Sequence, residues 1–384
     1  MAQNRKNKAH STIKGNHKTP AMQSSKSSLS KTTHPGICGW KLFTLGMLAA
    51  IVGVAISAYW TPLLRKRSST IHREDVVLHD VPFVVVDIPG KGKGAVASRD
   101  IKQGERILRE KPLFRVDLQI TSSPIALMAE KLAGLTPHQR KAFEDLSYVN
   151  FNLDPVKHPQ AVALAKFETN AVAAGKDRVG IFPTMARLNH GCSSAFNVVY
   201  SWRDDEEVLV VYALKAIKEG QELLTTYLDS KKPRAERRAF LNKHYGFNCT
   251  CSVCSLPDKL SKASDDRLTK IKALYAKFAT WGNNEIDGAQ AIQTIRDIWT
   301  VEDEEGYWSE RGSLAYDATW IAASHSDASA TQAWARKAVE WFSYEIGPDT
   351  TQVQSLLMVI ERPELHKAWG TRPTLMVGSP EPTN

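Results

Sequence analysis

The chain has 384 residues, of which 42% are hydrophobic and 24% are charged, a composition typical of a globular protein and not of a fibrous or wholly disordered one. Its length is sufficient for two or three domains. The net charge of +9 is distributed unevenly, because residues 1–41 hold eight Lys or Arg and no Asp or Glu, which leaves about +1 for the remaining residues. The folded part of the chain is therefore not expected to bind nucleic acid directly.

The N-terminal region is predicted to be a tail followed by a membrane anchor. Residues 1–41 are rich in polar residues and lack apolar periodicity, so we expect a disordered basic tail. Residues 42–60 contain no charge over 19 positions, which suits a transmembrane helix, although a signal peptide or a buried core helix has a similar apolar character. A linker at 61–75 follows. We expect a membrane-anchored protein whose later domains face the cytosol, or a nuclear or cytoplasmic protein if 42–60 is not a true span.

Short strands and helical segments are predicted in the middle of the chain. A first strand at 81–86 leads into a glycine-rich turn at 89–94 and then a second strand, and these glycines would allow the backbone to approach a ligand closely. Alternating and helical patterns continue downstream. They predict further strands at 106–114, 198–202, 208–213 and 223–227, and helices within 123–174 and at 234–245.

The region 261–368 has a different character from the rest of the chain. Apolar residues recur at helical spacing, as in Ile271, Leu274 and Phe278, which predicts an all-α domain of about five helices. An aromatic stripe that includes Trp334 and Trp341 is expected to be part of its core. Residues 369–384 are expected to form a disordered tail.

Four of the five cysteines have the spacing of a metal site. Cys249, Cys251 and Cys254 form a C-x-C-x2-C motif, and Cys192 lies far upstream. Three thiolates and one distant thiolate match the ligand set of a closed structural zinc site. Disulfides are the alternative in an oxidising compartment, but C-x-C is a poor spacing for them. We therefore predict a zinc ion that ties the cysteine motif to the turn at Cys192.

Four motifs follow one another along the chain: Gly-Lys-Gly-Ala-Val-Ala at 92–97, Asn-His-Gly-Cys at 189–192, Glu-Leu-Leu-Thr-Thr-Tyr at 222–227 and the cysteines at 249–254. In this order they resemble the SET-domain lysine methyltransferases over about residues 76–256, and most of all the SET- and MYND-containing subgroup and its fungal relatives. The MYND zinc insertion is absent, since no cysteine lies between positions 38 and 192. After Cys192 the chain reads Ser-Ser-Ala-Phe-Asn at 193–197, where the family has x-Pro-Asn.

The resemblance implies an α+β SET-type fold of short β-sheets with a helical insertion at about 115–180 and a post-SET zinc site, followed by the all-α domain. It implies S-adenosylmethionine as cofactor, with a zinc ion at the four cysteines. It also assigns roles to eight further residues. Tyr227 would be catalytic, Tyr245 would line the lysine channel, and the cofactor would contact Lys93, Gly94, Asn170, Asn189, His190 and Phe247.

The activity implied by the resemblance is transfer of a methyl group from S-adenosylmethionine to a lysine of a protein substrate, histone or non-histone. Methyl transfer requires a neutral lysine nitrogen aligned behind the methyl group, so orientation and electrostatics would dominate. The rival hypothesis is a catalytically inactive SET-fold scaffold that recruits partners through its helical domain. The altered turn after Cys192 is the feature that favours this rival.

Overall fold

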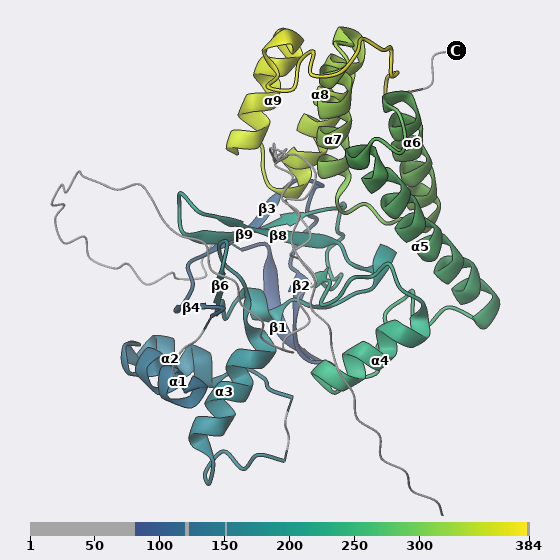
Figure 1. Ribbon diagram of the computed structural model, residues 1–384. Coiled ribbons are helices and arrows are strands. Elements are labelled where there is room, and N and C mark those ends of the chain that lie inside the picture. Colours follow the sequence, from purple (N-terminus) through teal and green to yellow (C-terminus); the bar gives the residue numbers. More distant parts are fainter. Residues whose placement is uncertain (1–80, 120–122, 150–151, 382–384) are drawn as a thin grey trace, which may run out of the picture. The chain divides into compact units, whose positions relative to one another are not determined.

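A computed structural model of the chain describes residues 81–119, 123–149 and 152–381. Within them, four small β-sheets are followed by a group of long helices (Figure 1). The α+β class predicted from the sequence, with short sheets and a helical C-terminal region, is confirmed. The predicted tail, membrane span and linker at 1–41, 42–60 and 61–75 all lie outside the described residues.

The first sheet is an antiparallel hairpin of β1 (Phe83–Ile88) and β2 (Gly92–Ala97). Gly92 closes its turn with a φ of +71°, a left-handed conformation that glycine adopts without a steric penalty. On its other side β2 contacts the segment that leads to Tyr227, because the N–H of Leu223 donates to the carbonyl of Ala95 at 2.8 Å. The hairpin is thus attached to one of the four sequence motifs.

Two three-stranded antiparallel sheets form the framework around this hairpin. The larger one has the order β3 (Arg106–Glu110), β9 (Val208–Ala213) and β8 (Val198–Arg203). Its central strand, β9, is buried at every position, which explains its uninterrupted apolar sequence. The smaller sheet has the order β4 (Arg115–Asp117), β6 (Arg178–Gly180) and β5 (Val172–Ala173).

A two-stranded parallel ladder joins sequence motifs that are more than 30 residues apart. Strand β7 (Asn189–His190) pairs with β10 (Leu224–Thr225), and Asn189 lies opposite Leu224 in the register. The N–H of Gly191 extends the ladder by donating to the carbonyl of Thr225 at 2.8 Å. The Asn-His-Gly-Cys motif and the segment preceding Tyr227 are therefore held side by side.

The predicted helical insertion contains α1 (Pro124–Ala133), α2 (Pro137–Glu144) and α3 (Pro159–Asn170). Each begins with a proline at its first position, where the missing N–H has no intrahelical partner to lose. Thr136 and Gln139 form a capping box at the start of α2. These helices pack against the β4–β6 region around a small core that contains Met128, Phe143 and Phe167 together with Val116 and Ile181.

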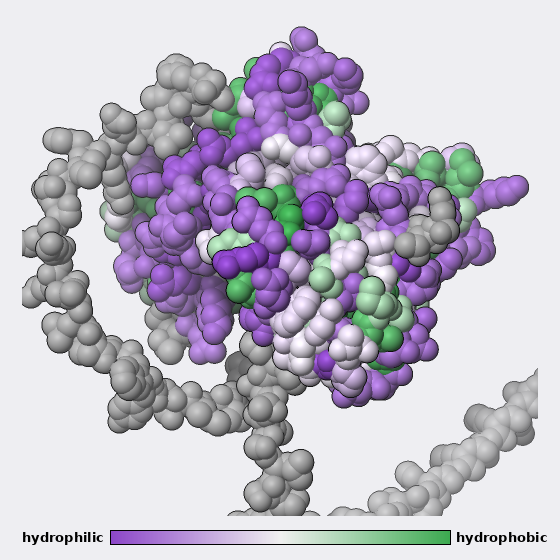
Figure 2. All heavy atoms as spheres, turned by 90° about the horizontal axis from the view of Figure 1, so that it is seen from above, coloured by the Kyte–Doolittle hydropathy of each residue, from purple (hydrophilic) through white to green (hydrophobic). Residues whose placement is uncertain are grey.

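The C-terminal region contains the five expected helices: α5 (Asp258–Ala279), α6 (Gly288–Glu305), α7 (Arg311–Ser324), α8 (Ala328–Glu345) and α9 (Thr351–Glu361). Their apolar faces meet around the fully buried Trp334, so the aromatic stripe is part of the core, as predicted. On the face seen from above in Figure 1, hydrophilic residues predominate over hydrophobic ones (Figure 2). Helices α5, α6, α8 and α9 are thus amphipathic, whereas α7 has no exposed residue and is enclosed by its neighbours.

The chain beyond α9 is more ordered than the sequence suggested. Val377 is only 3% exposed, and its N–H donates to Asp327 at 2.8 Å. The indole of Trp334 donates to the carbonyl of Gly378 at 3.0 Å. The expectation of a disordered tail is therefore incorrect for residues 369–381, because buried partners at the N-terminal cap of α8 and within α8 hold this segment.

The predicted membrane anchor requires a correction. No helix within residues 81–381, the gaps at 120–122 and 150–151 apart, is both long and apolar enough to cross a membrane. Even α5, with 22 residues, carries exposed charged side chains such as Lys259, Lys262 and Lys270 along its length. The predicted span at 42–60 lies outside the residues that were searched, so the membrane anchor and the location derived from it have no support in the part of the chain that the structure describes.

Candidate active site

A cavity of about 1310 Å³ opens beside the β7–β10 ladder. Six of the residues predicted to bind cofactor or substrate line it: Lys93, Asn170, Asn189, Tyr227, Tyr245 and Phe247. Gly94 and His190 are not among its lining residues. Tyr200 on β8 also lines the cavity and received no role from the sequence; an aromatic residue in a strand gives no local signal that separates a cavity wall from core.

The amide of Asn189 is held in one orientation by two acceptors. Its Nδ2 donates to Glu222 Oε1 at 2.9 Å and to the carbonyl of Lys93 at 3.3 Å. A carboxylate and a backbone carbonyl cannot donate hydrogen bonds, so they must face the NH2 group and not the amide oxygen. Asn189 Oδ1 consequently has no partner among the described residues. Glu222 also pairs with Lys91 at 2.5 Å, which links both sides of the hairpin turn to this amide.

Asn170 at the end of α3 follows the same pattern. Its Nδ2 donates to the carbonyls of Ser147 and Lys166, both at 2.7 Å. Both acceptors are backbone carbonyls, so the amide orientation is again determined by chemistry. Two asparagines from distant segments thus line one cavity, each with its Nδ2 anchored and its Oδ1 left as a hydrogen-bond acceptor.

Gly94 is required by close packing behind Asn189. A Cβ atom at this position would lie 2.6 Å from Asn189 Nδ2 and 2.4 Å from Ile88 Cδ1. Both distances are shorter than non-bonded contacts allow, so any side chain would displace the Asn189 amide. The structure thus shows a steric role for Gly94, which leaves room for the Asn189 amide, and its predicted contact with the cofactor stays a prediction.

The phenol of Tyr227 is oriented by a hydrogen bond to the backbone. Its hydroxyl donates to the carbonyl of Leu188 at 2.8 Å, and its ring lies 5.0 Å from that of Tyr245 between centroids. Burial raises the pKa of Tyr227 above its ordinary value, and raises that of Tyr200 to about 12. The tyrosines of this wall are therefore neutral at physiological pH and offer hydroxyl groups without negative charge.

His190 is buried next to the cavity and is bonded through both ring nitrogens. Its Nδ1 accepts the N–H of Tyr227 at 3.0 Å, and its Nε2 lies 3.1 Å from Cys192 Sγ. Only 5% of the residue is exposed, and burial lowers its pKa to about 4, so the ring is neutral. The structure thus places this ring between the tyrosine and the cysteines.

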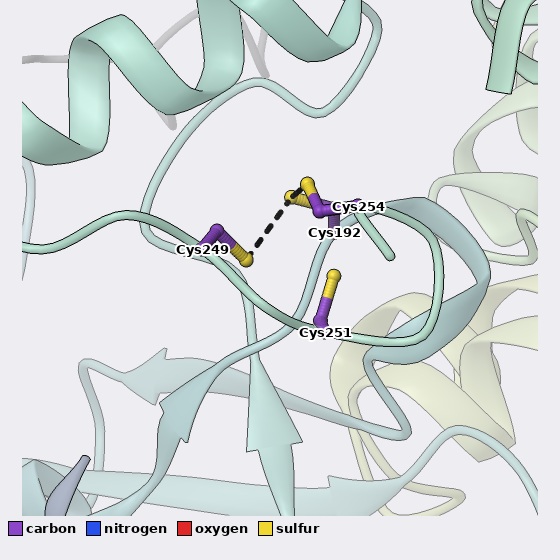
Figure 3. Close-up of side chains that lie close together, drawn as sticks. All are labelled: Cys192, Cys249, Cys251 and Cys254. Atoms are coloured by element: carbon purple, nitrogen blue, oxygen red, sulfur yellow. Dashed lines mark hydrogen bonds between the residues drawn. The ribbon is translucent and has the colours of Figure 1, made fainter. Parts of the chain in front are cut away.

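The four predicted cysteines converge on one point (Figure 3). All are buried, and their sulfur atoms lie within 4.8 Å of one another. Cys192 Sγ lies 3.6 Å from Cys254 Sγ and 4.0 Å from Cys249 Sγ. Four sulfurs at about 2.3 Å from a tetrahedral zinc ion would be about 3.8 Å apart, so this arrangement fits the ion. An S–S bond of about 2.05 Å would require a much closer pair.

The helix α4 (Arg234–Tyr245), whose bounds match the prediction, leads directly into the cysteine motif. It ends at Gly246, whose φ of +71° turns the chain toward Phe247. Arg238 on this helix donates to the carbonyls of Cys249 and Cys254, at 3.2 and 2.9 Å. The fully buried Arg237 also lies near the thiols, and its guanidinium pairs with Asp265 at 3.1 Å. Both arginines would favour a cluster of negatively charged thiolates.

The turn after Cys192, which departs from the family pattern, is held by new partners. Ser193 has a strained φ of +43°, and its hydroxyl donates to Glu305 Oε1 on α6 at 2.6 Å. Lys215 donates to the carbonyls of Ser194 and Gly306, at 2.9 and 2.7 Å. The helical region therefore stabilises the turn that the sequence left without its usual proline.

Asn197 takes a structural position in this rebuilt turn. Its Oδ1 accepts the N–H of Leu224 at 2.8 Å, and its Nδ2 donates to the carbonyl of Glu222 at 3.0 Å. The side chain thus supplies partners to two backbone groups at the start of β10. The asparagine that follows two positions later than in the family pattern still anchors the strand that precedes Tyr227.

One further residue, Glu110 at the end of β3, holds the approach to the Asn-His-Gly-Cys motif. Its two carboxylate oxygens accept the N–H groups of Thr184 and Met185, both at 2.8 Å, at the start of the short turn η1 (Met185–Arg187). It is only 7% exposed, and burial raises its pKa to about 7. Residues 106–110 read Arg-Ile-Leu-Arg-Glu, so the sequence offers no local signal that separates this buried glutamate from an exposed charge.

Comparison with known proteins supports the same reading. The SET domain family matches residues 92–228. Histone-lysine N-methyltransferase set5 of Schizosaccharomyces pombe is 30% identical over 291 residues, which cover 74% of this chain and 85% of that protein. N-lysine methyltransferase SMYD2-B of Danio rerio is 40% identical over 77 residues, which cover 20% of this chain and 17% of that protein.

Among solved structures, Rubisco LSMT bound to AdoMet matches over 76% of this chain and 89% of its own, with 12% identity and a TM-score of 0.31. This TM-score is too low to support an inference by itself. The SET domain match includes the segments that carry Lys93, Asn189 and Tyr227. The chain belongs to the SET-domain family of protein-lysine methyltransferases.

Proposed function

We propose that this protein transfers methyl groups from S-adenosylmethionine to lysine side chains of histones, with Tyr227 as the catalytic residue. The observation that carries the proposal is the convergence of Asn170, Asn189 and Tyr227 on one cavity. Lysine methylation follows from the family, and the histone substrate is suggested by the name of the set5 relative. No feature of the described residues favours the inactive scaffold over this reading.

The donor set of the cavity suits S-adenosylmethionine. The cofactor carries a primary ammonium and a sulfonium. Both positive groups are stabilised by oxygen atoms that have lone pairs and no positive charge. Asn170 and Asn189 supply such atoms through their Oδ1 groups, because their Nδ2 groups are occupied. Lys93 and Phe247 also line the cavity, where Phe247 offers an apolar face for an adenine ring. When bound, the cofactor supplies the electrophilic methyl group.

Tyr227 would orient the lysine that receives the methyl group. Because its hydroxyl hydrogen is directed to the carbonyl of Leu188, the lone pairs of its oxygen are available as acceptors. A neutral phenol can accept a hydrogen bond from a lysine amine without holding that amine in its charged form, as a carboxylate would. Tyr245, whose ring lies beside that of Tyr227, would form the wall of the channel for the lysine stem.

Cys192, Cys249, Cys251 and Cys254 would hold a structural zinc ion. Their separations fit a tetrahedral site, and Arg237 and Arg238 lie where they would stabilise its negative charge. In that case metal binding would contribute directly to folding free energy, since the loop has few apolar residues of its own. We retain 76–256 as the extent of the SET domain with its cysteines, and 261–368 as that of the helical domain.

Radioactive methyl transfer to recombinant histones tests the proposal. Tyr227→Phe is expected to lower kcat by about 100-fold or more, because one oriented polar group is lost where the reacting nitrogen must be aligned. Its affinity for S-adenosylmethionine, measured by calorimetry, should stay close to that of the wild type. Tyr344→Phe, which removes a hydroxyl from the helical domain, is the matched control and should remain active. Equal activity of Tyr227→Phe and the wild type would refute the catalytic assignment, and no labelling of histones would refute the substrate class.

A further inference from the structure

The ring of His190 has hydrogen-bond partners of different character on its two sides. The backbone N–H of Tyr227 lies 3.0 Å from Nδ1, and the sulfur of Cys192 lies 3.1 Å from Nε2. A backbone N–H is a donor only, so Nδ1 must be the unprotonated nitrogen of the ring. A neutral imidazole then carries its hydrogen on Nε2, and this hydrogen points at Cys192 Sγ.

This arrangement determines the tautomer without reference to any ligand. The Nδ1–H tautomer would place two hydrogens between His190 and Tyr227, and the doubly protonated ring would do the same. A sulfur that accepts the Nε2 hydrogen must present a lone pair, which a thiolate does best. The ring therefore connects the cysteine cluster to the backbone of Tyr227 through two directed hydrogen bonds.

The position of the ring argues against a direct contact with cofactor. His190 is 5% exposed and does not line the cavity, whereas its neighbour Asn189 does. Its ring packs on the protein side instead, with centroid distances of 5.3 Å to Tyr227 and 6.4 Å to Phe247. Both nitrogens are already bonded to protein atoms, so the ring has no polar atom left for a ligand.

We infer that His190 is a positioning residue, which orients Tyr227 through its backbone amide and is itself oriented by the thiolate of Cys192. The inference rests on the proposed catalytic role of Tyr227 and on the proposed zinc site. It gives the ring a role beside the expected contact of His190 with the cofactor, which stays a prediction. The cysteine cluster would then serve the active site as well as the fold, because it determines the tautomer of the ring that holds Tyr227 in place.

Two substitutions separate the two hydrogen bonds. In His190→Asn, the amide oxygen occupies roughly the place of Nδ1 and can still accept from Tyr227, but the donor to Cys192 is lost. In His190→Gln, the amide nitrogen occupies roughly the place of Nε2 and can still donate to Cys192, but the acceptor for Tyr227 is lost. Each full-length variant is compared with the wild type for kcat, for S-adenosylmethionine affinity and for zinc release to a chelator.

We expect opposite defects from the two variants. His190→Gln should lose at least tenfold in kcat relative to His190→Asn, since its Tyr227 is no longer held. His190→Asn should release zinc 10- to 100-fold more readily than His190→Gln, the range typical for loss of a hydrogen bond to a metal ligand. The affinity for S-adenosylmethionine should stay within about twofold in both. Equal kcat values for the pair, or a tenfold loss of cofactor affinity in both with unchanged kcat, would overturn the inference.

A measurement on the unmodified protein keeps the test decisive if a variant fails to fold. Nitrogen-15 NMR of the histidine-labelled wild-type protein should show a ring with unprotonated Nδ1 and protonated Nε2 at neutral pH. An Nδ1–H tautomer for His190 would refute the inference. Failure of the proposed function is recognised separately. A fully active Tyr227→Phe would refute the catalytic role of Tyr227, but it would not change the tautomer of His190 or the difference in zinc release between the two His190 variants.

Discussion

Glu222 provides a quantitative test of how the cofactor cavity is built. The substitution Glu222→Ala removes the carboxylate that accepts from Asn189 at 2.9 Å and pairs with Lys91 at 2.5 Å. A hydrogen bond to a charged acceptor contributes about 1.5–3 kcal/mol. The ion pair adds at most about 1 kcal/mol, because 30% of the Lys91 side chain is exposed to screening solvent.

Part of this energy would be recovered by water, so we take about 1.4 kcal/mol as the minimum cost of releasing the Asn189 amide. That free energy corresponds to a tenfold rise in the Kd for S-adenosylmethionine, measured by titration calorimetry. Glu219→Ala is the matched control, since it removes an exposed acid three residues away in the same turn. A Kd for Glu222→Ala within twofold of the wild type, alongside an unchanged control, would refute the idea that this carboxylate orients the amide.

Three further outcomes are expected. Gly94→Ala should weaken binding of S-adenosylmethionine and destabilise the fold by about 1–3 kcal/mol, because its Cβ would overlap the Asn189 amide; unchanged affinity and midpoint in thermal denaturation would contradict this. Cys251→Ser should reduce the zinc content, measured by elemental analysis, well below one ion per chain and lower the unfolding midpoint; full zinc occupancy would exclude Cys251 as a ligand. Burial raises the pKa of Glu345 from its ordinary 4.5 to about 8, so its stabilising contribution is present below pH 4.5 and is lost as the pH rises through 8. Within that window Glu345 should make the unfolding free energy of the wild type fall by about 1.4 kcal/mol per pH unit, and this contribution should be absent in Glu345→Gln. Denaturant titration across the window measures the difference, and parallel pH profiles for the two proteins would contradict the prediction.

Several features of this protein could be predicted from local sequence patterns. The bounds of α4 follow from a helical pattern that ends at a glycine suited to the left-handed conformation. The grouping of Cys192 with Cys249, Cys251 and Cys254 follows from their spacing and from the ligand number of zinc. The buried Trp334 follows from helical periodicity. For the helices, the pattern that predicts the structure lies within a few neighbouring residues. For the cysteines, the number of ligands that zinc requires matches the four residues of this spacing.

The partners of individual polar side chains were decided by the tertiary structure. Glu222 belonged to a recognised motif, but its contact with Asn189 depends on the parallel pairing of β7 and β10. The contact between Ser193 and Glu305 spans 112 residues, so the stabilisation of the altered turn could not be anticipated from the turn itself. Such contacts depend on where whole elements pack, and a local pattern carries no information about an acceptor supplied by a distant helix.

Burial and orientation explain the remaining differences. The orientation of the His190 ring could not be predicted locally: alternate residues of a strand point to opposite faces, and this ring faces the cysteines while Asn189 lines the cavity. Residues 369–381 looked like a tail because they lack periodicity, but Asp327 and Trp334 offer them buried hydrogen-bond partners. The sequence by itself determined the family, the fold class and the cysteine cluster. Only the tertiary structure decided which face of each short strand meets the cavity, because that choice depends on the surfaces against which the strand packs.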